Sequence, residues 1–151
     1  MKKCPLCGQA EFSRTSVSDV VQVGSIRFEL YVEGAACPCG ETFLDGMDIA
    51  SAEKKVARWL AAHGVATPEA FRYMRRALGI CSMDLADMFG VMPETISHWE
   101  DGKHEVPRNA IALLAGIVMD DACGRTDTVD RLRKLGGPGV APCTVTTFGS
   151  T

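Results

Sequence analysis

The 151-residue sequence contains no run of apolar residues long enough to span a membrane as a helix. The two lysines near the start are not followed by the apolar stretch of a secretory signal, so we expect a cytoplasmic protein. Positive charge is also scarce, because 16 Lys and Arg stand against 19 Asp and Glu, a formal net charge of −3. DNA-binding proteins normally carry a basic surface, so such a function depends on where the basic residues lie.

No pair of acid and base residues occurs at a plausible catalytic site, and we expect a protein that is not an enzyme. The length allows one domain or two small ones, and the 46% hydrophobic and 23% charged residues are ordinary for a soluble globular chain. Cysteine, by contrast, is abundant, with seven residues. An odd number without a secretory signal indicates a reducing compartment and metal binding rather than disulfides.

Four of the cysteines form two short clusters, Cys4-x-x-Cys7 and Cys37-x-Cys39, each followed by glycine. A Cys-x-x-Cys turn can direct two thiolates at one ion, and the glycine lets the backbone fold back toward the sulfur. Two or three β-like runs lie between the clusters, at Arg14–Ser18, Val20–Val23 and Ile26–Val32. Two knuckles that flank a β-hairpin predict a zinc ribbon.

We expect one structural Zn²⁺ per chain, since a core this small needs the folding energy that a metal site supplies. The expected ligands are Cys4, Cys7, Cys37 and Cys39. The second cluster is one residue shorter than the first, so its turn must differ. The alternative is that one sulfur is merely buried, with water or another side chain as fourth ligand. Four thiolates leave no open coordination position, which argues against a catalytic zinc.

The central part of the sequence predicts two short helices joined by a tight turn, followed by a third. Ser82 is suited to cap the first helix and Gly90 to end it. Pro93 is suited to begin the second, where a fixed φ is favourable. Met92, Ile96 and Trp99 fall on one side of that second helix, and polar residues fall on the other. A helix of two turns is not stable alone, so we expect neighbours to hold its apolar side and leave its polar side free.

The pattern L-A-x-x-F-G-V-x-x-x-T-I-S-x-W-E-x-G-K resembles the Xre/Cro-type helix-turn-helix family. The resemblance implies a second helix that enters the major groove of DNA. Arg72, Arg75 and Arg76 form a stripe at helical spacing, which partly answers the objection from net charge, and they are further candidates for phosphate contacts. The alternative is a small helical bundle without a DNA role. The expected DNA-binding residues are Ser82, Pro93, Glu94, Thr95, Ser97, His98, Lys103 and Arg108.

The predicted fold is α+β, with a small zinc ribbon followed by an all-α helix-turn-helix bundle. Further helices are expected at Met47–Gly64, Asn109–Asp121 and Thr126–Leu135, from the spacing of their apolar residues. Another is expected to be capped by Thr67 and to begin at Pro68. Cys81 and Cys123 are expected to be buried. The predicted division is a zinc-ribbon domain at 1–46, a connecting helix and linker at 47–66, a helix-turn-helix domain at 67–123, and a weak helix with a flexible tail, which contains Cys143, at 124–151.

This order of parts resembles the MqsA family of antitoxins, which carry a YgiT-type zinc finger. The resemblance implies a zinc domain that binds a ribonuclease toxin and a C-terminal domain that dimerises and represses its own operon. Glu94 and His98 stand where that family tends to have Asn and Arg, so its operator sequence does not transfer. We therefore expect a homodimeric repressor of a palindromic operator, the antitoxin of a type II toxin-antitoxin pair, with Ile117 and Val118 as candidates for the dimer interface.

Two other functions fit the same residues. One is a stand-alone transcriptional regulator whose ribbon senses metal or oxidants. The other is an adaptor whose ribbon recruits a protein partner while the helical part is only a scaffold. A neighbouring reading frame that encodes a small basic protein would favour the antitoxin function over the first alternative. DNA binding at physiological salt would exclude the second alternative.

Overall fold

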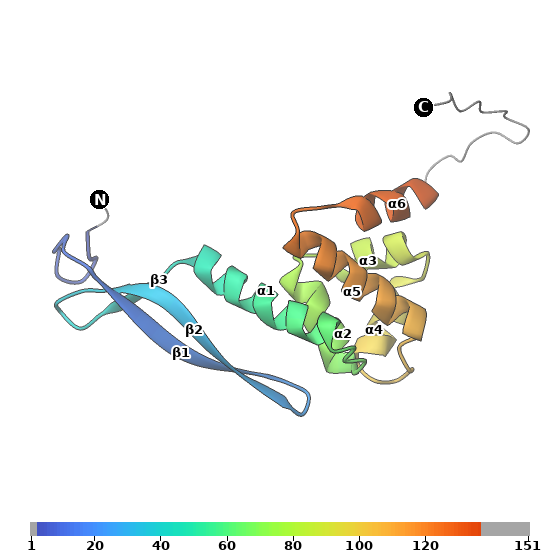
Figure 1. Cartoon of the computed structure of the whole chain (residues 1–151), viewed down its shortest axis with the longest axis horizontal. Coiled ribbons are helices and arrows are strands. Elements are labelled where there is room, and N and C mark those ends of the chain that lie inside the picture. Colours follow the sequence, from blue (N-terminus) through green and yellow to red (C-terminus); the bar gives the residue numbers. More distant parts are fainter. Residues whose placement is uncertain (1–2, 137–151) are drawn as a thin grey trace, which may run out of the picture.

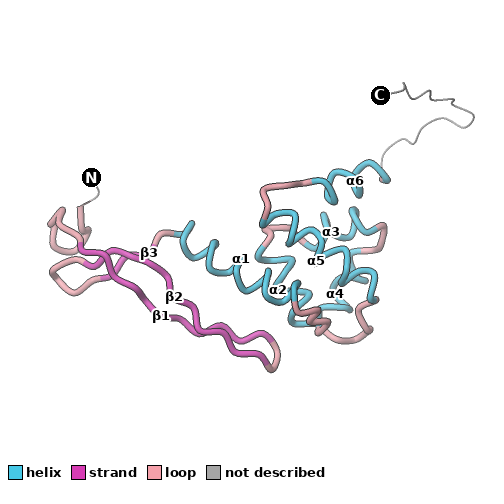
Figure 2. The backbone as a smooth tube through the Cα atoms, in the orientation of Figure 1, coloured by secondary structure: helices cyan, strands magenta, loops and turns pink. Residues whose placement is uncertain are grey.

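A computed structural model describes residues 3–136 of the chain. Within them the fold is α+β, with a three-stranded antiparallel sheet and six helices, and this confirms the predicted fold class. A long β-hairpin lies on one side of the molecule and the helices on the other, joined through α1 (Figures 1 and 2). The elements in order are β1 (Ser13–Val23), β2 (Ile26–Ala36), β3 (Thr42–Leu44), α1 (Gly46–Ala62), α2 (Pro68–Ala77), α3 (Ser82–Phe89), α4 (Pro93–Glu100), α5 (Arg108–Ala122) and α6 (Asp127–Leu135).

The hairpin is more regular than the sequence predicted. β1 and β2 are each 11 residues long and pair without a break from Ser13–Ala36 to Val23–Ile26. The two predicted runs before Gly24 are therefore one strand, because the ladder continues through Asp19, opposite Leu30. The predictions missed β3, which pairs with the end of β2 over three residues, too short for an alternating pattern to be seen.

Gly34 allows β3 to approach β2 closely. A Cβ atom at this position would lie 2.7 Å from Leu44 Cδ2 and 2.7 Å from the carbonyl oxygen of Phe43. The second contact is with backbone, which cannot move aside as a side chain can. A residue without a Cβ atom is therefore required where the chain turns back toward α1.

The hairpin is packed against the helices at its far end. The rings of Phe28 and Trp59 meet edge-on, with centroids 5.2 Å apart. Val23 is 3% exposed and belongs to the same buried cluster as Val56 and Leu60 of α1. The hairpin thus contributes to the core of the helical part, and the proposed division at residue 46 stays a prediction.

The helical core is built from α1 to α5. Its largest fully buried side chains are Phe71, Leu60, Met74, Leu85, Ile96 and Leu114. Phe71 meets Trp99 edge-on, with centroids 5.8 Å apart, and so links α2 to α4. Since large aromatic and aliphatic side chains dominate the burial of apolar surface, this set holds the two short helices α3 and α4 in place.

Local signals set most helix ends as the sequence predicted. Thr67 Oγ1 accepts a hydrogen bond from the N–H of Ala70 (3.2 Å) at the start of α2. Gly90 ends α3 with a left-handed φ of 65°. At the start of α3 the prediction was wrong, because the capping residue is Cys81 and Ser82 is the first helical residue.

Several predicted burial states were also wrong. Cys81 and Cys123 are exposed rather than buried. Met92, predicted to pack with Ile96 and Trp99, is 65% exposed. Ile117 and Val118 are each 3% exposed, so they are packed inside this chain and are not available to a dimer interface. They lie on α5, whose apolar side is covered because α1 packs along it.

The predicted helix near the end of the described residues is confirmed as α6. Asp120 Oδ2, on α5, accepts hydrogen bonds from the N–H (3.1 Å) and the hydroxyl (2.7 Å) of Thr128. Val129 and Leu132 pack partly buried against the core. The predicted flexible tail beyond this helix, with Cys143, lies outside the described residues. Between residues 3 and 136, none of the helices has the length and apolar character needed to cross a membrane.

Candidate functional site

The two cysteine clusters form turns of different size. In the first, the N–H of Gly8 donates to the carbonyl oxygen of Cys4, four residues earlier (2.8 Å). In the second, the N–H of Gly40 donates to the carbonyl oxygen of Cys37, three residues earlier (2.9 Å). Both glycines have positive φ, 75° and 96°. The shorter Cys-x-Cys spacing is thus accommodated by a tighter turn that still directs its cysteines at the first cluster.

The four thiols converge on one point. The sulfur atoms of Cys4 and Cys39 are 3.8 Å apart, those of Cys7 and Cys37 are 3.4 Å apart, and all four lie within 4.8 Å of one another. A tetrahedral zinc ion with Zn–S bonds of about 2.3 Å places its sulfurs about 3.8 Å apart. The donor set and its spacing therefore fit a metal ion held by four thiolates.

Backbone N–H groups, burial and the neighbouring thiols shift the pKa values of two of the four thiols. The backbone N–H of Cys7, the strongest influence, lowers the pKa of the Cys4 thiol to about 7. For Cys37 the backbone N–H of Cys39 acts to lower the pKa, but burial and the neighbouring thiols together outweigh it and raise the pKa to about 12. Thiolates this close repel one another, and a divalent cation between them removes that repulsion.

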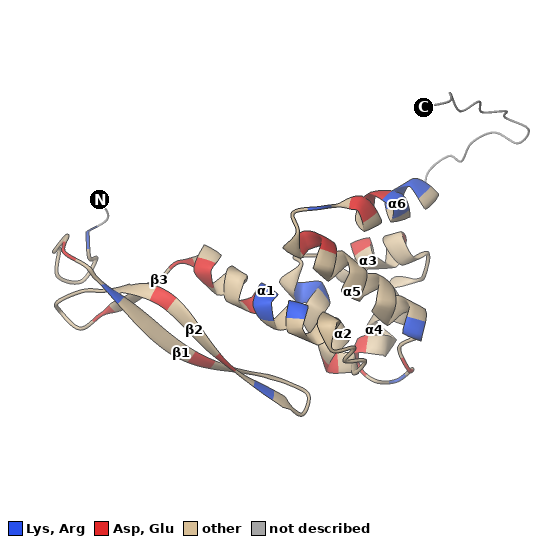
Figure 3. Cartoon of the chain, in the orientation of Figure 1, with Lys and Arg blue, Asp and Glu red and all other residues tan. Residues whose placement is uncertain are grey.

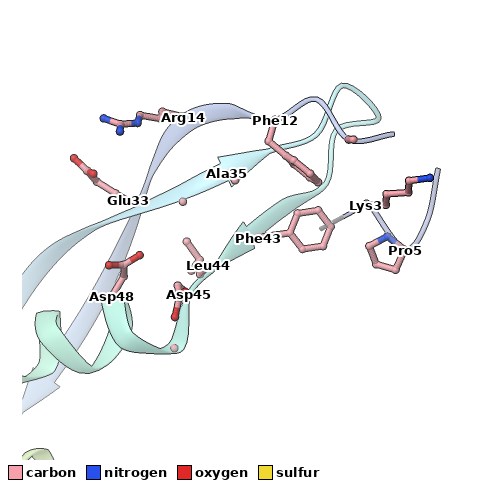
Figure 4. A pocket seen from close by; sticks show the side chains of 13 residues that line it. Lys3, Pro5, Phe12, Arg14, Glu33, Ala35, Phe43, Leu44, Asp45 and Asp48 are labelled. Atoms are coloured by element: carbon pink, nitrogen blue, oxygen red, sulfur yellow. The ribbon is translucent and has the colours of Figure 1, made fainter. Parts of the chain in front are cut away.

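A groove of about 930 Å³ is lined in part by Lys3 and Pro5, the neighbours of Cys4 in the chain (Figure 4). The rings of Phe12 and Phe43 meet there edge-on, with centroids 5.8 Å apart. Leu44 also lines the groove and is 39% exposed. Charged side chains surround this apolar surface: Lys3, Arg14, Glu33, Asp45 and Asp48. The end of the hairpin that carries the four thiols (the metal end) thus offers an apolar surface rimmed by three acidic and two basic side chains.

The second candidate site is the pair α3 and α4, joined by the turn 90–92. The N–H of Val91 donates to the carbonyl oxygen of Ala86 (3.0 Å) and fixes that turn. Ile96 and Trp99 are 0% and 7% exposed and attach α4 to the core. The other side of α4 is open to solvent, as the sequence predicted. Of the predicted DNA-binding residues, Glu94, Ser97, Lys103 and Arg108 are exposed, and Ser82, Pro93, Thr95 and His98 are partly buried.

One member of the predicted arginine stripe is not free. The guanidinium group of Arg75 is paired with Glu100, and the two side chains are only 11% and 8% exposed. Arg75 therefore cannot serve as a contact for phosphate, and that part of the prediction was wrong. Arg72 and Arg76 are exposed. The ion pair of Arg75 with Glu100 also neutralises Glu100, one of the acidic residues at the end of α4.

A comparison with protein families gives a match that covers this arrangement. The family described as the antitoxin component of a bacterial toxin-antitoxin system, MqsA, matches residues 1–121. The chain belongs to the MqsA antitoxin family. No curated protein matches it. Membership of the MqsA family implies a toxin partner, and the predicted family is confirmed.

The match with the MqsA family covers both candidate sites, the four thiols and the α3–α4 pair, but ends before α6. In this MqsA-family chain the sequence signals located the thiols and the two helices, because cysteine spacing and Gly and Pro positions are local features. They did not reveal the Arg75–Glu100 pair or the exposure of Met92. No local pattern pointed to the partner of Glu100, because the two residues of the pair are 25 positions apart in the sequence.

Proposed function

We propose that this MqsA-family protein is a zinc-containing, sequence-specific DNA-binding repressor, the antitoxin of a type II toxin-antitoxin pair that controls its own operon. The observation that carries the proposal is the family match over residues 1–121, because it spans both the four thiols and the α3–α4 pair. The protein acts without catalysis, in the cytoplasm. It binds a toxin of the ribonuclease class through its metal-containing part.

Zinc is the metal we propose, held by Cys4, Cys7, Cys37 and Cys39. The support is the convergence of four sulfurs, a donor set that favours zinc over hard cations such as Mg²⁺ and Ca²⁺. Bound there, the ion supplies the folding energy that the small hairpin end lacks. Its role is structural.

The α3–α4 pair is proposed to act as a helix-turn-helix, with α4 in the major groove. Glu94 is exposed in its first turn, where a carboxylate can accept a hydrogen bond from the N4 amino group of cytosine. Ser97 and His98 face the bases one turn further on, next to Pro93. The residues proposed to contact the DNA backbone are Ser82, Thr95, Lys103 and Arg108.

The distribution of charge is compatible with this surface although the whole chain is acidic. Lys and Arg are interspersed with Asp and Glu on both the hairpin and the helices (Figure 3). The carboxylate of Glu100 is neutralised by Arg75, so it does not repel phosphate. Lys103, in the loop after α4, and Arg108, the first residue of α5, are exposed and free to approach the DNA backbone.

We propose that the protein binds its operator as a homodimer. One short helix reads too few base pairs to find a site among genomic competitors. A two-fold axis would place two copies of α4 about one helical turn of DNA apart, roughly 34 Å, on a palindrome. Because Ile117 and Val118 are inside the chain, the interface must use other residues.

The test is to select duplexes from a random library with the purified protein, and to measure binding to single-base variants of the best one at physiological salt. Glu94→Ala should relax the preference at one base pair and cost about 1–3 kcal/mol on the best site. Arg108→Ala should weaken binding to all duplexes alike, and should reduce the slope of log affinity against log salt concentration by about one. Glu29→Ala removes the same charge from the exposed side of β2 and serves as control.

A uniform loss with Glu94→Ala would contradict base readout by this residue. If the protein binds no duplex specifically, the proposed repressor function is wrong and the alternative function as an adaptor is favoured. The toxin is tested separately, by co-expression with the product of an adjacent reading frame. A stable complex that relieves its toxicity is expected, and growth inhibition that persists would argue for a stand-alone regulator.

A further inference from the structure

Met92 occupies the N-cap position of α4, and its side chain is 65% exposed. Residues favoured at this position carry an oxygen that accepts a hydrogen bond from the first turn of the helix. Methionine cannot do so strongly, and Met92 makes no such bond. It does not pack in the core with Ile96 or Trp99 either. Neither helix capping nor core packing therefore explains a large apolar residue here.

The position of Met92 on the candidate DNA-binding surface is fixed. The turn before it is held by the hydrogen bond from Val91 to Ala86, and the residue after it is the proline that begins α4. Met92 has extended backbone angles, φ −77° and ψ 149°, and its exposed side chain stands two residues before the exposed Glu94. In helix-turn-helix proteins the N-terminal residues of the second helix are those that contact base edges.

We infer that Met92 reads thymine, by packing its side chain against the C5-methyl group in the major groove. The inference rests on the proposed DNA-binding function. The thymine methyl is the apolar group that base pairs present in this groove, and apolar side chains recognise it by contact. An unbranched thioether side chain can adjust to the position of the methyl group. Met92 thus supplies an apolar contact beside the hydrogen bond that Glu94 makes to cytosine.

The experiment uses the full-length, zinc-loaded protein and the best duplex from the selection. Each thymine is replaced in turn by deoxyuridine, which removes the methyl group and leaves every hydrogen-bonding group in place. Dissociation constants are measured by fluorescence anisotropy. One thymine in each half-site should be sensitive, and its replacement should weaken binding about fourfold, the effect of losing one buried methyl-sized group.

Met92→Ala should remove this sensitivity, so that thymine and deoxyuridine duplexes bind with a ratio of about one. Met92→Leu should keep part of the ratio, and Met92→Gln, of similar length but polar, should lose it. Because the side chain is largely exposed, none of these changes should unfold the protein, and circular dichroism checks this. Met47→Ala is the control and should leave the ratio unchanged, since Met47 is also an exposed methionine near the start of a helix (81%) but lies at the metal end.

Two results would overturn the inference, and they are distinguishable. If specific binding is strong but no thymine is sensitive, or if the sensitive thymine stays so in Met92→Ala, Met92 does not read the methyl group and the repressor function stands. If the selection yields no preferred duplex, the proposed DNA-binding function fails and the inference fails with it.

Discussion

Arg75 and Glu100 join the second helix to the end of the fourth. The guanidinium Nε and one terminal nitrogen of Arg75 each donate to a different oxygen of Glu100, the second bond being 3.0 Å long. The other terminal nitrogen donates to the carbonyl oxygen of Ile80 (2.9 Å), just before α3. One side chain thus ties together α2, α4 and the start of α3. Two-point pairing of this kind also fixes orientation.

This relationship predicts a large effect of breaking the pair. Glu100→Ala leaves the nearly buried guanidinium of Arg75 without its partner, and we expect the free energy of unfolding to fall by about 3–5 kcal/mol. Urea unfolding followed by circular dichroism measures the change. Asp101→Ala, at the next and exposed position, should change stability by less than about 0.5 kcal/mol. The double variant Arg75→Met with Glu100→Leu should recover most of the loss, and equal losses in the single and double variants would contradict the prediction.

The cysteine cluster predicts one zinc ion per chain. Mass spectrometry of the native protein should give that stoichiometry, and a chelator should unfold the hairpin end because structural sites of this size are generally unfolded without metal. Cys4→Ser should have the same effect. The α1–α5 core has its own buried side chains and should keep its helical circular dichroism. Cys123→Ser, at an exposed cysteine outside the cluster, is the control. The zinc assignment would be refuted if the purified protein contained no metal, or if the hairpin end stayed folded in the presence of a chelator.

Gly34 lies where β3 pairs with β2, and its close contacts predict the effect of adding a side chain there. Gly34→Ala places a Cβ atom 2.7 Å from the backbone oxygen of Phe43, so β3 must move away from β2. We expect a loss of stability of about 1–3 kcal/mol, as for other over-packed positions. Gly46→Ala, at the start of α1, meets nothing within 4 Å and should be neutral or slightly stabilising. Thermal unfolding of the zinc-loaded proteins compares them, and similar melting temperatures for both would be against the prediction.

Asp120 and Thr128 predict a pH dependence at the start of α6. The hydroxyl of Thr128, and then its backbone N–H, lower the pKa of the Asp120 carboxyl. Because this pKa is lower in the folded state, its stabilising effect is present above the unfolded pKa, about 3.9, and is lost as the pH falls through the folded value. Thr128→Val should raise the pKa of Asp120, measured by NMR titration. Thr126→Val removes a hydroxyl that donates to Asp130 (2.9 Å) and should leave the pKa of Asp120 unchanged.

The sequence by itself determined the local features of this protein. The spacing of the four cysteines, the glycine at position 90 and the Thr67-Pro68 pair each act within a few residues, so they located the knuckles and most helix ends. The period of apolar residues located α1, α2, α5 and α6 for the same reason. The order of these parts was enough to indicate the MqsA family, which the match over residues 1–121 confirms.

The tertiary structure alone decided which side chains are free to act. Arg75 and Glu100 are 25 residues apart, and their pairing removed an arginine that helical spacing had assigned to phosphate. Ile117 became unavailable because α1 packs along α5, while Met92 became available because the turn before α4 directs it outward. A periodic pattern gives the side of a helix on which a residue lies. Only the packing of distant segments decides whether that side is covered, because burial depends on neighbours that the local sequence does not specify.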